Sequence, residues 1–180
     1  MTAEEFDILY DFHDGDVFLP FEIQEDTIII TFDLARWIQR KWVEEKYGKV
    51  ACGDRRSFIV KAKFSHCKNI VAKEWVFKKS RPNNNKKPER IIMETTLQAF
   101  DPELMLEFVE TENQNEISLW FFSSDIKGKG FDGKGGMICF SMENVEVIEE
   151  ALYDEKATDA LYDKFEKLAV QYTESSKDGK

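Results

Sequence analysis

Cysteine and histidine are scarce in this sequence of 180 residues, which contains three cysteines and two histidines. The cysteines are odd in number and scattered, at Cys52, Cys67 and Cys139. This pattern gives no sign of a disulfide framework and predicts reduced thiols in a cytoplasmic protein. His13 and His66 are the side chains that ordinarily titrate near neutral pH, so the sequence offers few candidate general bases.

Motifs for catalysis and for metal binding are also missing. The sequence has neither the G-x-S-x-G pattern of serine hydrolases nor the H-E-x-x-H pattern of zinc peptidases. His66 and Cys67 are adjacent, so on a strand they would point to opposite faces and could not act as base and nucleophile. The group His13, Asp14 and Asp16 suits a turn, with a bound cation as the alternative. The sequence therefore predicts no catalytic, cofactor-binding or metal-binding residues, and it favours a protein that is not an enzyme.

Long apolar runs are absent, and none approaches the roughly 20 residues that a membrane helix needs. The first twelve residues, MTAEEFDILYDF, are acidic and lack the basic and apolar segments of a signal peptide. We therefore expect a cytoplasmic protein without membrane association. With 42% hydrophobic and 13% aromatic residues, the composition is that of a globular protein. The length predicts one domain at residues 1–173 and a solvated tail at 174–180.

Basic residues are absent from two long segments, although the net charge of the whole chain is only −10. Residues 1–35 carry ten acidic groups and residues 91–126 carry eight, with no Lys or Arg in either segment. Residues 36–90, in contrast, carry 17 basic and five acidic groups. Two explanations stay open. Acidic and basic segments could lie on neighbouring strands and compensate one another, or one segment could form a face for a partner of opposite charge.

Alternating apolar residues predict a mostly antiparallel sheet of about six to eight strands. The expected strands are 16–24, 27–32, 57–64, 69–78, 90–98, 104–110, 117–122 and 136–141. Two strands followed by a helix, then several strands and further helices, indicate an α+β fold with the helices on one face of the sheet.

Helical spacing of apolar residues predicts one helix after the first hairpin and one or two helices near the C-terminus. The first helix would begin at the capping residue Asp33 and use Leu34, Trp37, Ile38 and Trp42. The C-terminal helices would use Val145, Ile148 and Leu152 in one case, and Leu161, Phe165, Leu168 and Tyr172 in the other.

One glycine-rich stretch, GKGFDGKG at residues 128–135, has the glycine and lysine spacing of a phosphate-binding loop. Gly135, however, stands where such a loop needs a hydroxyl to bind Mg²⁺. An apolar run at 136–141 follows, where a phosphate-binding loop would open a helix. The stretch therefore favours a hairpin loop. An enzyme or binder of a phosphorylated ligand at residues 127–136 is the third and least favoured hypothesis.

The basic segment gives an alternative function, because aromatic rings among lysines can hold single-stranded nucleic acid through stacking and phosphate neutralisation. If Trp75 instead faces the core, as most strand aromatics do, this function is lost. Residues 78–90, KKSRPNNNKKPER, predict a polar hairpin tip. The candidate contacts are Lys61, Lys63, Lys73, Trp75, Lys78, Lys79, Arg81, Lys86 and Lys87.

The sequence is thus interpreted as a small acidic interaction protein, of inhibitor, immunity or adaptor type, that binds a macromolecular partner through a charge-complementary surface. A protein partner is expected, since the net charge would repel nucleic acid. The alternative is a single-stranded nucleic-acid-binding module that uses residues 61–90.

Overall fold

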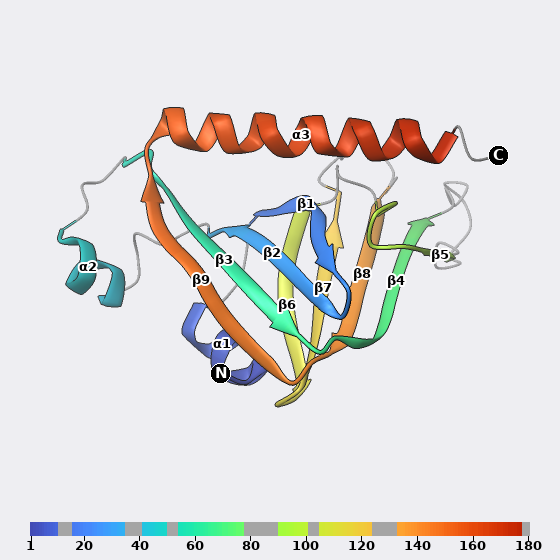
Figure 1. The fold of residues 1–180 in the computed structure, drawn as a ribbon, viewed down its shortest axis with the longest axis horizontal. Helices are drawn as coiled ribbons and strands as arrows, with labels where there is room; N and C mark the ends of the chain where they lie inside the picture. The colour runs from blue at the N-terminus through green and yellow to red at the C-terminus, as the bar shows by residue number, and fades with distance from the viewer. Residues whose placement is uncertain are drawn as a thin grey trace, which may run out of the picture.

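The computed structural model describes residues 1–10, 16–34, 41–49, 54–77, 90–100, 105–123 and 133–177. Within them, nine strands form two antiparallel sheets accompanied by three helices, which confirms the α+β class (Figure 1). The helices are α1 (Ala3–Tyr10), α2 (Lys41–Tyr47) and α3 (Glu155–Lys177). The strands are β1 (Asp16–Gln24), β2 (Thr27–Asp33), β3 (Ser57–Ser65), β4 (Lys68–Phe77), β5 (Arg90–Thr95), β6 (Met105–Asn113), β7 (Glu116–Phe122), β8 (Lys134–Ser141) and β9 (Asn144–Tyr153).

Two long chain segments, residues 57–77 and residues 134–153, each run from one sheet into the other around a common corner. The four-stranded sheet has the order β1-β2-β3-β9, and the five-stranded sheet has the order β5-β4-β8-β7-β6. β3 leads into β4 through residues 66–67, and β8 leads into β9 through residues 142–143. Because β3 pairs with β9 and β4 pairs with β8, the same two segments stay paired on both sides of this corner. The sheets diverge from the corner as the two arms of a V (Figure 1).

The main core fills the space between the sheets. Every second residue of β3 from Phe58 to Phe64 points into it, as the alternation of the sequence predicts. Helix α1 supplies Phe6 and Tyr10, both essentially inaccessible to solvent. The Phe6 ring lies edge-on to Phe64, with ring centroids 5.6 Å apart. Burial of each large apolar side chain contributes about 1.5–3 kcal/mol, so α1 is an integral part of the core.

Glu150 on β9 holds the two short helices against the four-stranded sheet. Its carboxylate accepts hydrogen bonds from the Tyr10 hydroxyl of α1 (2.9 Å) and from the Lys46 ammonium of α2 (2.6 Å). Its backbone carbonyl accepts a third from the Tyr47 hydroxyl (3.3 Å). Burial, together with the neighbouring Glu150 carboxylate, raises the pKa of Tyr10 above its ordinary value. The Tyr10 hydroxyl therefore stays a hydrogen-bond donor at neutral pH.

Helix α3 runs across the top of the view in Figure 1 and packs on the face of the four-stranded sheet that points away from the main core. Phe165 packs against Phe18 of β1 and Ile59 of β3, with Leu161 and Leu168 beside them. This contact confirms the last helix that the apolar spacing predicts. The Tyr162 hydroxyl reaches the same sheet and lies 2.8 Å from the Asp16 carboxylate. None of the helices in the part of the chain described above is long and apolar enough to cross a membrane.

The helix predicted at Val145, Ile148 and Leu152 is wrong, because these residues belong to strand β9. A β-bulge opposite Lys61 and Ala62 of β3 inserts an extra residue into β9. The extra residue is Ile148, which is exposed and has no register partner on β3, and its position three residues after Val145 and four before Leu152 imitates a helix in the sequence. This strand also raises the count to nine, above the expected six to eight.

Four further differences concern the helices and the sheet. The apolar spacing of the sequence did not predict α1, and the strands form two sheets where one was expected. The helices are not gathered on one face, because α1 contributes to the core between the sheets while α3 lies outside. Asp33 ends β2, and Leu34 after it is not helical. Trp37 and Ile38 lie outside the described residues, and α2 begins only at Lys41.

We predict that Glu150→Ala lowers the free energy of unfolding by about 2 kcal/mol, since the buried Tyr10 hydroxyl loses its acceptor. Urea denaturation would measure the change. Glu143→Ala is the control, because Glu143 forms a mostly exposed ion pair with Lys68 (3.6 Å) and should change stability by less than about 0.5 kcal/mol. Equal losses in the two variants would contradict the role of Glu150.

Asp33 gives a prediction about pH. Burial raises the pKa of Asp33, hydrogen bonds from Ser57 and Tyr162 lower it, and the nearby Asp16 charge raises it, with a net upward shift. A folded-state pKa above the unfolded value means that the folded protein holds the proton more tightly, so stability falls as pH rises through this window. Asp33→Asn cannot ionise at this position, so the variant does not lose stability through this group as pH rises. Its free energy of unfolding, relative to the unsubstituted protein at the same pH, should therefore increase between about pH 3 and pH 7. A constant or decreasing difference would refute this account.

Candidate functional site

Two of the candidate lysines lie on β3 among acidic neighbours. The Lys61 ammonium forms an ion pair with Glu22 of β1 (2.7 Å) and is in register with Glu149 of β9. Lys63 is in register with Glu146, also on β9. Opposite charges on adjacent strands stabilise their pairing. At these positions the structure agrees with the explanation that acidic and basic segments compensate one another.

The remaining candidate lysines and the arginine belong to β4 or to the segment after it. Lys73 on β4 is in register with Glu94 on β5, again a basic residue opposite an acidic one. The five others lie outside the described residues: Lys78, Lys79, Arg81, Lys86 and Lys87. The predicted polar hairpin tip falls on the same stretch.

Trp75 is buried, with 3% of its surface exposed, but it does not belong to the core between the sheets. Ala72 on the same strand faces that core, so Trp75, three residues later, faces outward. The Arg90 guanidinium of β5 lies 3.8 Å from the centre of the indole ring, a cation–π contact. The rings of Trp120 and Phe122 lie near, each with a centroid distance of 6.0 Å. The indole is therefore covered on the outside, where a stacked nucleobase would need access.

Gly135 on β8 makes room for this indole. A Cβ atom at Gly135 would lie 2.4 Å from Trp75 Nε1, a distance that real structures do not show. Only glycine therefore lets Trp75 lie flat against β8. The indole N–H is buried and has no hydrogen-bond partner among the described residues. Apolar packing and the arginine above it hold the ring.

The outer face of the five-stranded sheet is apolar and aromatic around Trp75. Its half-buried side chains include Trp120 and Phe122 of β7 together with Met137 and Cys139 of β8. Two carboxylates border this face. The Trp120 N–H donates to Glu110 (3.1 Å), and the Cys139 thiol donates to Glu116 (3.4 Å).

Strand β5 forms an exposed apolar edge beside that face. Ile91, Ile92 and Met93 are 37%, 55% and 44% exposed. Ile70 and Val71 on the adjoining strand β4 are exposed as well. Ile91, Ile92 and Met93 are consecutive on one strand, whereas single exposed apolar residues are ordinary. We call these three residues the β5 edge; Ile70 and Val71 lie beyond the stretch of β4 that pairs with β5.

The β5 edge differs from the other ends of the two sheets. β5 pairs with β4 on one side, and no described strand pairs with its other side. The end strands β1 and β6 contact each other, and β9 contacts α1 and is bonded to α2. Natural edge strands are protected by charged side chains, short length, proline or a bulge. β5 is short and carries Arg90 and Glu94 at its ends, but its middle, Ile91 to Met93, has no charge, no proline and no bulge.

The glycine-rich stretch is part of the connection between β7 and β8, which pair as an antiparallel hairpin. Residues 128–133 also spell G-x-G-x-x-G, a spacing that dinucleotide-binding folds place between a strand and a helix. Here β8 begins at Lys134, so a strand follows both patterns. The hairpin agrees with the interpretation from the sequence. Residues 124–132 lie outside the described part of the chain.

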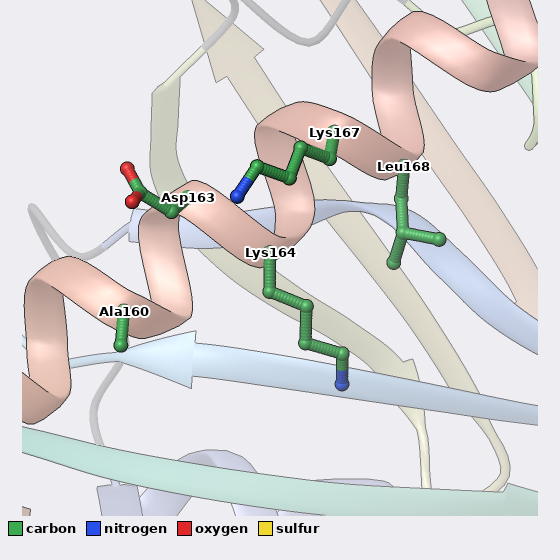
Figure 2. A pocket seen from close by; sticks show the side chains of 5 residues that line it. All are labelled: Ala160, Asp163, Lys164, Lys167 and Leu168. Carbon is green, nitrogen blue, oxygen red and sulfur yellow. The ribbon is translucent and has the colours of Figure 1, made fainter.

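A shallow hollow of about 460 Å³ lies along α3. All its lining residues come from successive turns of this one helix (Figure 2): Ala160, Asp163, Lys164, Lys167 and Leu168. The hollow has one carboxylate, two ammonium groups, and the side chain of Leu168, which also packs beside Phe165. It brings together no residues from different elements that could act on a bound molecule.

Groups that could hold a metal do not gather among the residues seen in the structure, where no three of the His, Cys, Asp and Glu side chains converge. Cys67 is buried, and burial raises the pKa of its thiol to about 11. A protonated thiol is a poor nucleophile and a poor metal ligand. Cys52, His13 and Asp14 lie outside the described residues.

Comparison with known proteins adds no relative: no family model, no curated protein and no solved structure matches this chain. The candidate site therefore rests on its own geometry, and the β5 edge is the strongest feature of that geometry.

We predict that Gly135→Ala lowers the free energy of unfolding by about 1–3 kcal/mol, because the added methyl group forces the Trp75 indole out of place. Gly133→Ala is the matched control, since its Cβ would lie 3.6 Å from Phe77, an ordinary contact. Urea denaturation of Gly135→Ala, of Gly133→Ala, of Trp75→Leu and of the double variant Gly135→Ala with Trp75→Leu would test the contact. If the effects of the two substitutions are simply additive, Gly135 and Trp75 are not coupled as described.

Proposed function

We propose that this protein is an interaction protein that binds a protein partner as an additional strand along the β5 edge. The observation that carries the proposal is the exposed run Ile91, Ile92 and Met93 on a strand that is paired on one side. In recognition by strand addition, the backbone of the edge strand supplies hydrogen bonds, and alternate side chains supply specificity. β5 offers both.

The apolar side chains of β5 point to both faces of the sheet. Ile92 is in register with Trp75 and shares its outer face, while Ile91 and Met93 lie on the opposite face. An added strand would therefore cover apolar surface on both sides of the sheet. Burial of apolar surface is the main favourable contribution to association.

Two observations favour a protein over nucleic acid as the partner. The Trp75 ring is covered by Arg90, and the described lysines Lys61, Lys63 and Lys73 are each in register with a glutamate. The net charge of −10 would also repel phosphates. Partner binding at β5 is compatible with the inhibitor, immunity and adaptor types, because each acts by docking. A cytoplasmic location remains part of the proposal, supported by three scattered cysteines that suggest no disulfide framework.

Photo-crosslinking from β5 tests the proposal and requires no candidate partner to be chosen beforehand. A benzophenone amino acid placed at position 92 should form covalent protein adducts on irradiation of native cells, and nuclease treatment should not remove them. The same group at Ile148, which is 44% exposed on β9, is the control and should give few adducts. Absence of adducts at position 92, adducts that nuclease destroys, or equal yields at the two positions would each refute strand addition at β5.

A further inference from the structure

The β5 edge complements its own sequence. We propose that the added strand is β5 of a second copy of this chain, so that two molecules form an antiparallel dimer about a twofold axis at Ile92. This inference rests on the proposed function and specifies its partner. The two five-stranded sheets would then become one continuous sheet across the axis.

The order of residues in β5 supports this register. The strand reads Arg90-Ile91-Ile92-Met93-Glu94-Thr95. With Ile92 opposite Ile92 of the second copy, Arg90 faces Glu94 of the second copy, and symmetry repeats this pair at the other end. Ile91 faces Met93 of the second copy on the other side of the sheet. Opposite charges and apolar pairs directly across antiparallel strands are stabilising.

Other arrangements lose this complementarity. A shift of two residues toward Thr95 places Ile92 opposite Glu94 of the second copy, a charge against an apolar side chain. A parallel arrangement in the same register brings Arg90 near Arg90 of the second copy, and like charges near one another destabilise a sheet. Among these arrangements, only the antiparallel register centred on Ile92 pairs both charges.

One of the two charged residues is already held in place in the single chain. Arg90 is stacked on Trp75, and both Arg90 and Glu94 alternate with Ile91 and Met93, so they belong to the outer face that carries Ile92. A side chain that is ordered before association, as Arg90 is, loses less conformational entropy in the complex. The guanidinium group also keeps several N–H donors for a carboxylate while its plane covers the indole.

The size of the edge determines the expected strength of the dimer. β5 has six residues, so its contact is short compared with the interface of about 1,600 Å² that is typical of stable complexes. We therefore expect monomer and dimer in equilibrium, with the dimer favoured at high concentration. Closed twofold pairing also removes the free edge that would otherwise promote open-ended aggregation.

The test is the mass of the purified full chain, measured by light scattering and by sedimentation equilibrium over a concentration series. The mass should rise from 21.1 kDa toward twice that value. Ile92→Lys places two ammonium groups opposite each other at the axis and should weaken association at least about tenfold. Ile148→Lys, the same change at an isoleucine of β9 that is 44% exposed, should leave the association unchanged.

Charge reversal provides a second and more specific arm. Arg90→Glu alone and Glu94→Arg alone each place like charges opposite one another, so each should weaken the dimer. When the two variants are mixed in equal amounts, each mixed dimer pairs glutamates of one chain with arginines of the other at both ends of β5, and association should return. Circular dichroism of each variant confirms that loss of the dimer is not loss of the fold.

A wild-type chain that is monomeric at every concentration would overturn the inference, as would a dimer that Ile92→Lys does not weaken or a mixture that does not recover. These results are distinguishable from failure of the proposed function. A monomer that still crosslinks from position 92 to other proteins refutes the self-pairing and leaves strand addition intact. A monomer that forms no protein adduct at position 92 refutes both.

Discussion

The pairing of residues 57–77 with residues 134–153 is the constraint on which the rest of the fold depends. Along its first half this ladder is β3 with β9, and along its second half it is β4 with β8. Backbone bonds close the corner, including Glu143 N–H to the Ser65 carbonyl (3.0 Å) and Cys67 N–H to the Asp26 carbonyl (2.6 Å). Since one ladder belongs to both sheets, its bend turns their inner faces toward each other and creates the core.

The position of β5 at the end of its sheet, where no described strand pairs with its outer side, follows from this arrangement. β3 and β8 each have a partner on both sides, so the sheets can grow only at their remaining ends. At those ends β1 and β6 contact each other, and β9 contacts α1, but β4 is extended only by the six residues of β5. The apolar residues of β5 thus remain at the surface, although they resemble core residues in the sequence.

Charge segregation along the sequence becomes proximity in space. The basic segment supplies β3 and β4, whereas the acidic segments supply β1, β2 and all of β5 except Arg90. Antiparallel pairing and packing place Lys61 and Lys63 next to carboxylates of β1 and of β9, a strand from the later part of the chain. Local compensation reduces the field that either segment would produce alone. What remains is the overall negative charge, which affects the rate and choice of association more than its strength.

The sequence by itself determined the class of the fold and most of its strands, because alternation of side chains is a local property with a period of two. It also determined the last helix, where Leu161, Phe165 and Leu168 follow the helical period without interruption. It failed at Val145–Leu152, since a bulge is defined by the partner strand, and the partner is remote in sequence. The tertiary structure alone decided the candidate site. Whether Trp75 faces the core or the outside depends on register, and whether Ile92 is buried depends on which strand lies next to β5. Both are set by contacts between segments far apart in the chain, whereas the sequence pattern records only the neighbours of each residue along it.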